Sequence, residues 1–211
     1  MKGKYKGITL VCIVVLALVV YIFAKGDVPV SSFVGEYDEA SEGLVITFDF
    51  VSQSGYASNQ FAVWIEDLEG NFVKTLYATR YTANGGYRNR PDSIPTWVRK
   101  SNLADMSKSE VDAITSATPR SGTLSYLWDM ADKDGVPVPS GEYKFFVEGS
   151  LRWKNRVLYS GVVDIGSIST RIELELERFY EADSNQAALT SNSIENSMLS
   201  GVFANFIAPN D

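Results

Sequence analysis

The 211-residue sequence predicts an all-β fold, an antiparallel β-sandwich preceded by an N-terminal transmembrane helix. Two observations predict the sandwich. Short runs of β-branched and aromatic residues are separated by turn residues, and few stretches have a helical pattern. One further observation predicts the membrane helix, because a long apolar run without charge lies near the N-terminus.

The apolar run covers residues 8–24 and follows three lysines within the first six residues. At about 1.5 Å of rise per residue, such a run approaches the ~30 Å hydrocarbon thickness of a bilayer. Basic residues ahead of it hold that end in the cytoplasm, so we expect the rest of the chain to be exported. A cleaved signal peptide is the alternative, although Ile22 and Ala24 form a poor cleavage pair.

The chain is expected to have four parts. These are an anchor or signal segment at residues 1–26, a linker at 27–42, an exported domain at 43–207 and a tail at 208–211. The anchor would cross the cytoplasmic (inner) membrane and leave the domain on the periplasmic side.

The exported domain lacks the histidine and cysteine residues from which many metal sites and catalytic triads are built. The chain contains no histidine and one cysteine, Cys12, which lies within the apolar run as an ordinary buried thiol. The domain therefore cannot build a Ser-His-Asp triad, a Cys/His zinc site, a Cys-ligated iron–sulfur cluster or a His-ligated haem. We expect no metal site and no catalytic residue, and any redox chemistry would need an organic cofactor.

The strands are predicted in order along this domain. Residues 44–53 alternate, with Leu44, Ile46, Phe48 and Phe50 on one buried face. Six further strands are predicted, the first two joined as a hairpin by a turn at Gly70: 60–67, 71–81, 123–128, 141–151, 157–165 and 171–179.

One segment is predicted as a helix, and a second fits either a helix or a strand. Residues 106–114 are predicted as a helix, because Ser107 can cap its first turn and Glu110 follows three residues later. Residues 198–207 fit either a helical stripe or a closing strand. Gly201 in the middle and the β-branched and aromatic residues near the end favour the strand.

Charge is distributed unevenly along the chain. The net charge is −7, yet residues 80–100 carry five basic residues against Asp92 alone. The acidic remainder is poor at holding phosphates, so we expect no nucleic-acid partner. Pro91 and Pro95 indicate an ordered loop in the basic segment.

Within this basic segment, Arg88, Arg90 and Trp97 are candidate cofactor-binding residues. Arginine forks beside aromatic faces suit a ligand with a phosphate and a flat ring. The alternative is a solvated loop that pairs with the acidic remainder of the domain.

Residues 128–143 resemble the W-D-x-x-D-x-x-G-x-x-V-P-x-G-x-Y signature of flagellar-hook-cap-type immunoglobulin-like domains, and residues 65–76 resemble the hairpin that precedes it. The resemblance implies an immunoglobulin-like β-sandwich. We expect Trp128 to lie in the core, Asp129 and Asp132 to accept hydrogen bonds from loop amides, and Gly135 to turn the chain. A calcium site is the alternative for the carboxylates, although their spacing is not that of an EF-hand.

Residues 112–118 are similar to the D-x-x-[ST]-G-A-T motif of exported flavin-carrying domains, with Ser116 in place of the glycine. In those proteins a dedicated transferase esterifies the phosphate of FMN onto the last threonine. The resemblance implies that Thr118 is the acceptor and that Asp112 orients or activates it. Thr115 and Ala117 match the remaining motif positions, Ala117 as the small neighbour that permits approach.

On a larger scale, the order of segments over residues 40–207 resembles a bacterial periplasmic family known as domain of unknown function 2271. Among the segments that carry this resemblance are Arg90-Pro91-Asp92, residues 112–118, Trp128-Asp129 and residues 157–161. The resemblance implies one exported immunoglobulin-like domain, often associated with flavin transferases and membrane-bound redox proteins.

We therefore expect a membrane-tethered extracytoplasmic protein associated with flavin-based electron transfer, which carries FMN on Thr118. Its expected partners are a flavin transferase and a membrane redox protein. We expect an electron carrier or a binding module in preference to an enzyme. The alternative function is a cofactor-free envelope binding or assembly module. A glycosidase with paired carboxylates such as Asp129 and Glu142 ranks last, because the sequence does not place them together.

Overall fold

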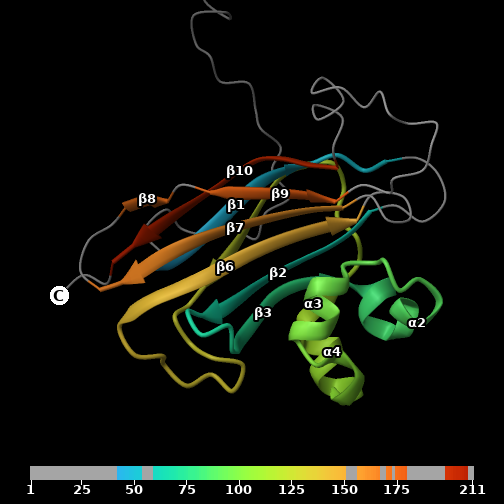
Figure 1. Cartoon of the computed structure of the whole chain (residues 1–211), viewed down its shortest axis with the longest axis horizontal. Helices are drawn as coiled ribbons and strands as arrows, with labels where there is room; N and C mark the ends of the chain where they lie inside the picture. Colours follow the sequence, from blue (N-terminus) through green and yellow to red (C-terminus); the bar gives the residue numbers. More distant parts are fainter. Residues whose placement is uncertain are drawn as a thin grey trace, which may run out of the picture. The chain divides into compact units, whose positions relative to one another are not determined.

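The computed structural model describes residues 42–53, 59–150, 156–166, 170–172, 174–179 and 198–208, which form a two-sheet β-sandwich (Figure 1). The all-β prediction is thus confirmed. The predicted membrane anchor at residues 8–24 lies outside the described residues. Within the described ranges, no helix is both long and apolar enough to cross a membrane.

The first sheet has four strands in the order β5-β1-β10-β8, and every pairing is antiparallel. Their bounds are Gly122–Trp128 for β5, Gly43–Phe50 for β1, Leu199–Ile207 for β10 and Thr170–Ile172 for β8. Strand β10 therefore confirms that residues 198–207 form a closing strand.

The second sheet has six strands in the order β4-β3-β2-β6-β7-β9. Only the pairing of β3 with β4 is parallel among the described strands. The bounds are Thr115–Ser116 for β4, Phe72–Thr79 for β3, Gln60–Asp67 for β2, Gly141–Ser150 for β6, Arg156–Ile165 for β7 and Glu175–Phe179 for β9.

The main core lies between the two sheets and follows the predicted alternation. Leu44, Ile46, Phe48 and Phe50 of β1 are all fully buried, as expected for one face of that strand. Phe61 of β2 meets them from the other sheet, with its ring centroid 5.6 Å from that of Phe48 and 5.3 Å from that of Phe50. These aromatic contacts join the two layers.

A second core covers the outer face of the six-stranded sheet. Strand β2 is buried on both sides: Phe61, Val63 and Ile65 face the main core, whereas Ala62 and Trp64 belong to the second cluster. The short helices between β3 and β5 pack on this outer face (Figure 1). They are η1 (Thr82–Gly86), α2 (Tyr87–Asn89), α3 (Pro95–Lys100), η2 (Leu103–Asp105) and α4 (Lys108–Ile114).

The predicted ordered loop at residues 80–100 is therefore largely helical. Pro95 occupies the first turn of α3, where its fixed φ suits a helix and its missing N–H costs nothing. Trp97 on the same helix is fully buried and belongs to the second core. The predicted helix at residues 106–114 is confirmed as α4, and the Ser107 hydroxyl and Glu110 form a complete capping box.

The predicted single strand at residues 171–179 is divided between the sheets. Strand β8 pairs with β10 in the four-stranded sheet, whereas β9 pairs with β7 in the six-stranded sheet. Strand alternation shows which residues can form strands, but it does not show which of two facing sheets each one joins.

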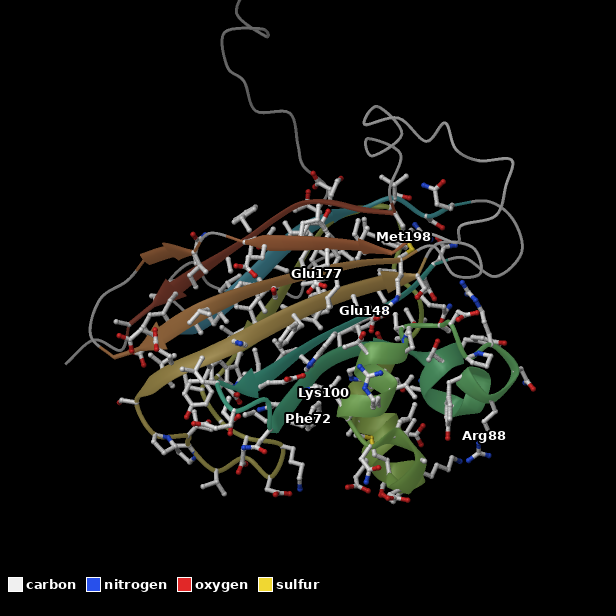
Figure 2. All side chains as sticks on the ribbon, viewed as in Figure 1. Phe72, Arg88, Lys100, Glu148, Glu177 and Met198 are labelled. Atoms are coloured by element: carbon white, nitrogen blue, oxygen red, sulfur yellow. The ribbon has the colours of Figure 1, made fainter. Side chains whose placement is uncertain are left out.

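Helix α3 is fixed to the sheet by buried carboxylates (Figure 2). At its first turn, the fully buried Glu148 of β6 accepts hydrogen bonds from the backbone N–H groups of Trp97 at 2.9 Å and Thr96 at 3.3 Å. Arg156 of β7 donates from Nη1 to the same carboxylate at 2.7 Å. At the last turn, Lys100 pairs with the buried Glu66 of β2 at 2.7 Å.

We predict that Glu148→Gln lowers the free energy of unfolding by about 3 kcal/mol, because it removes a buried charge that both Arg156 and the helix amides contact. The exposed Glu142 lies on the same strand, so Glu142→Gln is the matched control and should change stability by less than about 0.5 kcal/mol. Urea unfolding measures both variants. Equal stability of the two would contradict the role given to Glu148.

Candidate functional site

The segment that resembles a flavin-attachment motif runs from α4 into an extended exposed stretch. Asp112 lies on α4 and is exposed, whereas Thr115 begins β4 and is buried. The Thr115 hydroxyl donates to the carbonyl of Val111 at 2.9 Å, which satisfies a carbonyl at the end of the helix. Ala117 and Thr118 follow in an exposed stretch without regular structure.

The Thr118 side chain is exposed. Among the residues that the structure describes, neither this hydroxyl nor the Asp112 carboxylate makes a hydrogen bond. Within the motif, the Thr115 side chain is buried in the fold and Ile114 packs against the second core. The motif is therefore anchored at its middle by Thr115 and has an exposed end.

Tyr77 holds the middle of this motif against the sandwich. Its hydroxyl donates to the carbonyl of Ala117 at 3.3 Å, and its ring stacks on Phe61 with centroids 4.7 Å apart. Strand β4 also pairs with β3, with Thr115 opposite Ala78. Burial raises the pKa of Tyr77 to about 12, because the phenolate would lose its hydration.

The three candidate residues of the basic segment lie in different surroundings. Arg88 on α2 is exposed, and its guanidinium carbon lies 5.5 Å from the ring centroid of Tyr87 (Figure 2). Trp97 is fully buried, and its indole N–H donates to Thr75 at 2.9 Å. Its ring is thus part of the core and is not available to stack on a ligand at the surface.

Arg90 is only 6% exposed, and its three guanidinium nitrogens are buried without a hydrogen-bond partner among the described residues. Burial lowers the pKa of Arg90 from its ordinary value, and the neighbouring Tyr81 and Asp92 oppose this effect. Within the described chain, no hydrogen bond or ring contact joins Arg88, Arg90 or Trp97 to residues 112–118.

A buried polar network next to Arg90 was not predicted from the sequence. Gln60 Oε1 accepts hydrogen bonds from the hydroxyls of Thr79 and Thr82, both at 2.8 Å. The Thr82 hydroxyl also bonds to that of Ser93 at 2.6 Å. These residues fix the basic segment onto the outer face of β2. Single polar residues within strands give no sequence signal of such a network, because each is ordinary by itself.

The hook-cap-like hairpin has a structural role, as predicted. Trp128 is fully buried and its indole N–H donates to the carbonyl of Ala131 at 2.8 Å. Asp132 Oδ1 accepts from the backbone N–H groups of Asp134 and Val136, both at 2.9 Å. Asp129 pairs with Lys74 at 2.7 Å. Across the described residues, no group of acidic side chains is arranged to hold a metal ion.

A two-sheet β-sandwich with short helices on one outer face is the class of protein that these features define. The chain belongs to the DUF2271 family, described as predicted periplasmic protein, whose family model matches residues 43–180. No curated protein and no solved structure matches the chain. The family thus confirms the larger of the sequence resemblances and supports a periplasmic location for the domain.

The buried Tyr77 hydroxyl predicts a pH dependence of stability. Its pKa rises from 10.0 to about 12 on folding, so the folded state keeps this proton more tightly than the unfolded state. Its contribution is complete below about pH 10 and is lost as the pH rises towards 12. We predict that unfolding free energy falls between about pH 9.5 and about pH 11.5 by about 2 kcal/mol more in the wild type than in Tyr77→Phe.

Urea unfolding of both proteins at the two pH values measures this difference. The other tyrosines and the lysines titrate in both proteins, so their effect cancels when the wild type is compared with Tyr77→Phe. An identical fall in the two proteins would show that the Tyr77 hydroxyl is not buried in solution.

Proposed function

We propose that the protein is a membrane-tethered periplasmic electron carrier with FMN covalently attached to Thr118. The observation that carries this proposal is the exposed Thr118 hydroxyl, free of hydrogen bonds to the described residues, at the end of a motif that begins with an exposed Asp112. The tether is the apolar segment at residues 8–24. As a carrier, the domain would not itself be an enzyme.

The strand pairings support an immunoglobulin-like fold for this carrier. In the four-stranded sheet β1 lies between β5 and β10, and in the six-stranded sheet β2 lies between β3 and β6, which also pairs with β7. These neighbours correspond to the A-B-E and C′-C-F-G orders of immunoglobulin-like domains, with the C-terminal β10 at the position of strand A.

A flavin suits a domain without histidine or cysteine, because the cofactor supplies the redox chemistry and asks the protein only for position and electrostatics. The residues present fit covalent attachment. Thr118 offers its hydroxyl, Asp112 offers a carboxylate that can take the hydroxyl proton, and Ala117 leaves room for a transferase to approach.

Attachment needs an activated donor, and a flavin dinucleotide meets this need. The Thr118 Oγ1 forms a bond to the phosphorus on the flavin side while the pyrophosphate bond breaks and adenosine monophosphate leaves. The hydroxyl proton passes to a base, for which Asp112 is the candidate. A flavin transferase would catalyse this step, and a membrane redox protein would then exchange electrons with the tethered domain, which the tether keeps at high effective concentration.

The test is intact-mass measurement of the full chain after co-expression with a flavin transferase. We predict a mass increase of one FMN less one water in the wild type and in Thr118→Ser, which keeps a hydroxyl. Thr118→Val should show no increase, because it keeps the shape but lacks the oxygen nucleophile. An unmodified wild-type mass, or an adduct that survives in Thr118→Val, would contradict the proposal and favour a cofactor-free binding module.

Ser116 gives a second prediction. It occupies the position at which the motif has glycine, and it lies in β4 opposite Thr79. Glycine there would loosen the backbone ahead of Thr118. We predict that Ser116→Gly raises the initial rate of attachment by roughly two- to tenfold, as followed by flavin fluorescence of the protein band in a gel. A slower reaction would show that pairing of β4 with β3 helps to present Thr118.

A further inference from the structure

Arg90 differs from the other buried charged residues of the described chain. Glu66 pairs with Lys100 and Glu148 pairs with Arg156, in each case at 2.7 Å. Arg90 is also buried, at 6% exposure, yet its Nε, Nη1 and Nη2 atoms have no hydrogen-bond partner within the described ranges. A guanidinium keeps its charge in proteins, and a buried charge without a partner is strongly unfavourable.

The backbone around Arg90 is held in one conformation. The Arg90 N–H donates to the carbonyl of Gly86 at 2.9 Å, and the Arg90 carbonyl accepts from the N–H of Ser93 at 3.0 Å. Ile94 has a φ of 42°, in the left-handed region that a β-branched residue rarely occupies, and its N–H donates to Ser150 of β6 at 2.8 Å. Contacts with the sheet thus hold this turn in a strained backbone conformation. Strain of this kind is typical of functional segments.

We propose that Arg90 is the anion-binding residue of a ligand site in residues 81–93, and that this site takes the phosphate group of a ligand with a flat aromatic ring. A guanidinium fork binds a phosphate through two parallel hydrogen bonds. The basic character of residues 80–100 favours a doubly charged phosphate over a singly charged carboxylate.

The surface next to Arg90 supplies aromatic faces for the ring. Tyr81 is 51% exposed and lies directly on Gly86, where a Cβ atom would come within 2.6 Å of Tyr81 Cε1. Tyr87 presents its ring beneath the Arg88 guanidinium. Because the Arg90 guanidinium is covered, binding requires rotation of a covering side chain. We assign this movement to Tyr81, because its side chain is 51% exposed and it belongs to the same turn as Arg90.

This site is independent of the Thr118 proposal, because it needs no covalent bond and no residue of the attachment motif. The test therefore uses the full chain in non-ionic detergent, expressed without a flavin transferase. Isothermal titration calorimetry measures binding of FMN, riboflavin, inorganic phosphate and acetate. We expect FMN and inorganic phosphate to bind, riboflavin to bind at least about tenfold more weakly than FMN, and acetate to bind at least about tenfold more weakly than phosphate.

Two variants separate an anion-binding Arg90 from a merely structural one. Arg90→Met should abolish phosphate binding and raise the Tm of the ligand-free chain, because it removes a buried charge that lacks a partner. Arg90→Lys keeps the charge but lacks the fork, and it should weaken phosphate binding roughly tenfold. The exposed Arg99 on α3 is the matched control, and Arg99→Met should leave the phosphate affinity within about threefold.

Three results would overturn the proposal: wild-type phosphate affinity in Arg90→Met, a lower Tm of that variant without ligand, or equal affinities for FMN and riboflavin. Failure here would leave an FMN adduct on Thr118 unaffected. Absence of that adduct would likewise leave phosphate binding by Arg90 unaffected.

Discussion

The carboxylate of Glu148 is the contact on which the helical segment between β3 and β5 depends. The helices of this segment are too short to be stable alone, because a helix of fewer than about 12 residues is marginal in water. Glu148 satisfies two N–H groups at the first turn of α3 and also pairs with Arg156. Glu66 and Lys100 fasten the last turn. Polar groups that face outward from the sheet thus hold the helices in place.

Both candidate functional regions belong to this one segment. The turn that contains Arg90 lies just before α3, and the motif that ends in Thr118 begins within α4. The sandwich supplies a rigid support, since β2 is buried on both faces and its aromatic residues pack between the sheets. Function is commonly carried by connections of this kind, which a rigid scaffold positions.

The sequence allowed the strands to be predicted well where alternation or turn residues mark them. Leu44 to Phe50 and the Gly70 hairpin are examples, as is α4 with its Ser107 cap. The division of residues 171–179 between two sheets could not be predicted, because both halves have the same strand pattern. The helices of residues 80–100 were missed, since Pro95 is as compatible with a loop as with the first turn of a helix.

The candidate site, like the fold, could be predicted from the sequence only in part. Residues 112–118 were found through a motif, and their exposure fits it, apart from the buried Thr115. The environment of the basic segment was not predictable, because an arginine-rich stretch with prolines has the composition of a solvated loop. Burial of Trp97 depends on contacts with distant strands, such as its hydrogen bond to Thr75 of β3.

The central proposal is that Thr118 carries a covalent FMN, and the most direct measurement is made on protein isolated from the cells that produce it. Trypsin cleaves after Lys108 and Arg120, which releases residues 109–120 with the whole motif. Tandem mass spectrometry of this peptide should locate one FMN phosphoester on Thr118. Recovery of the peptide only in its unmodified form, from cells that make flavin-linked proteins, would contradict the account.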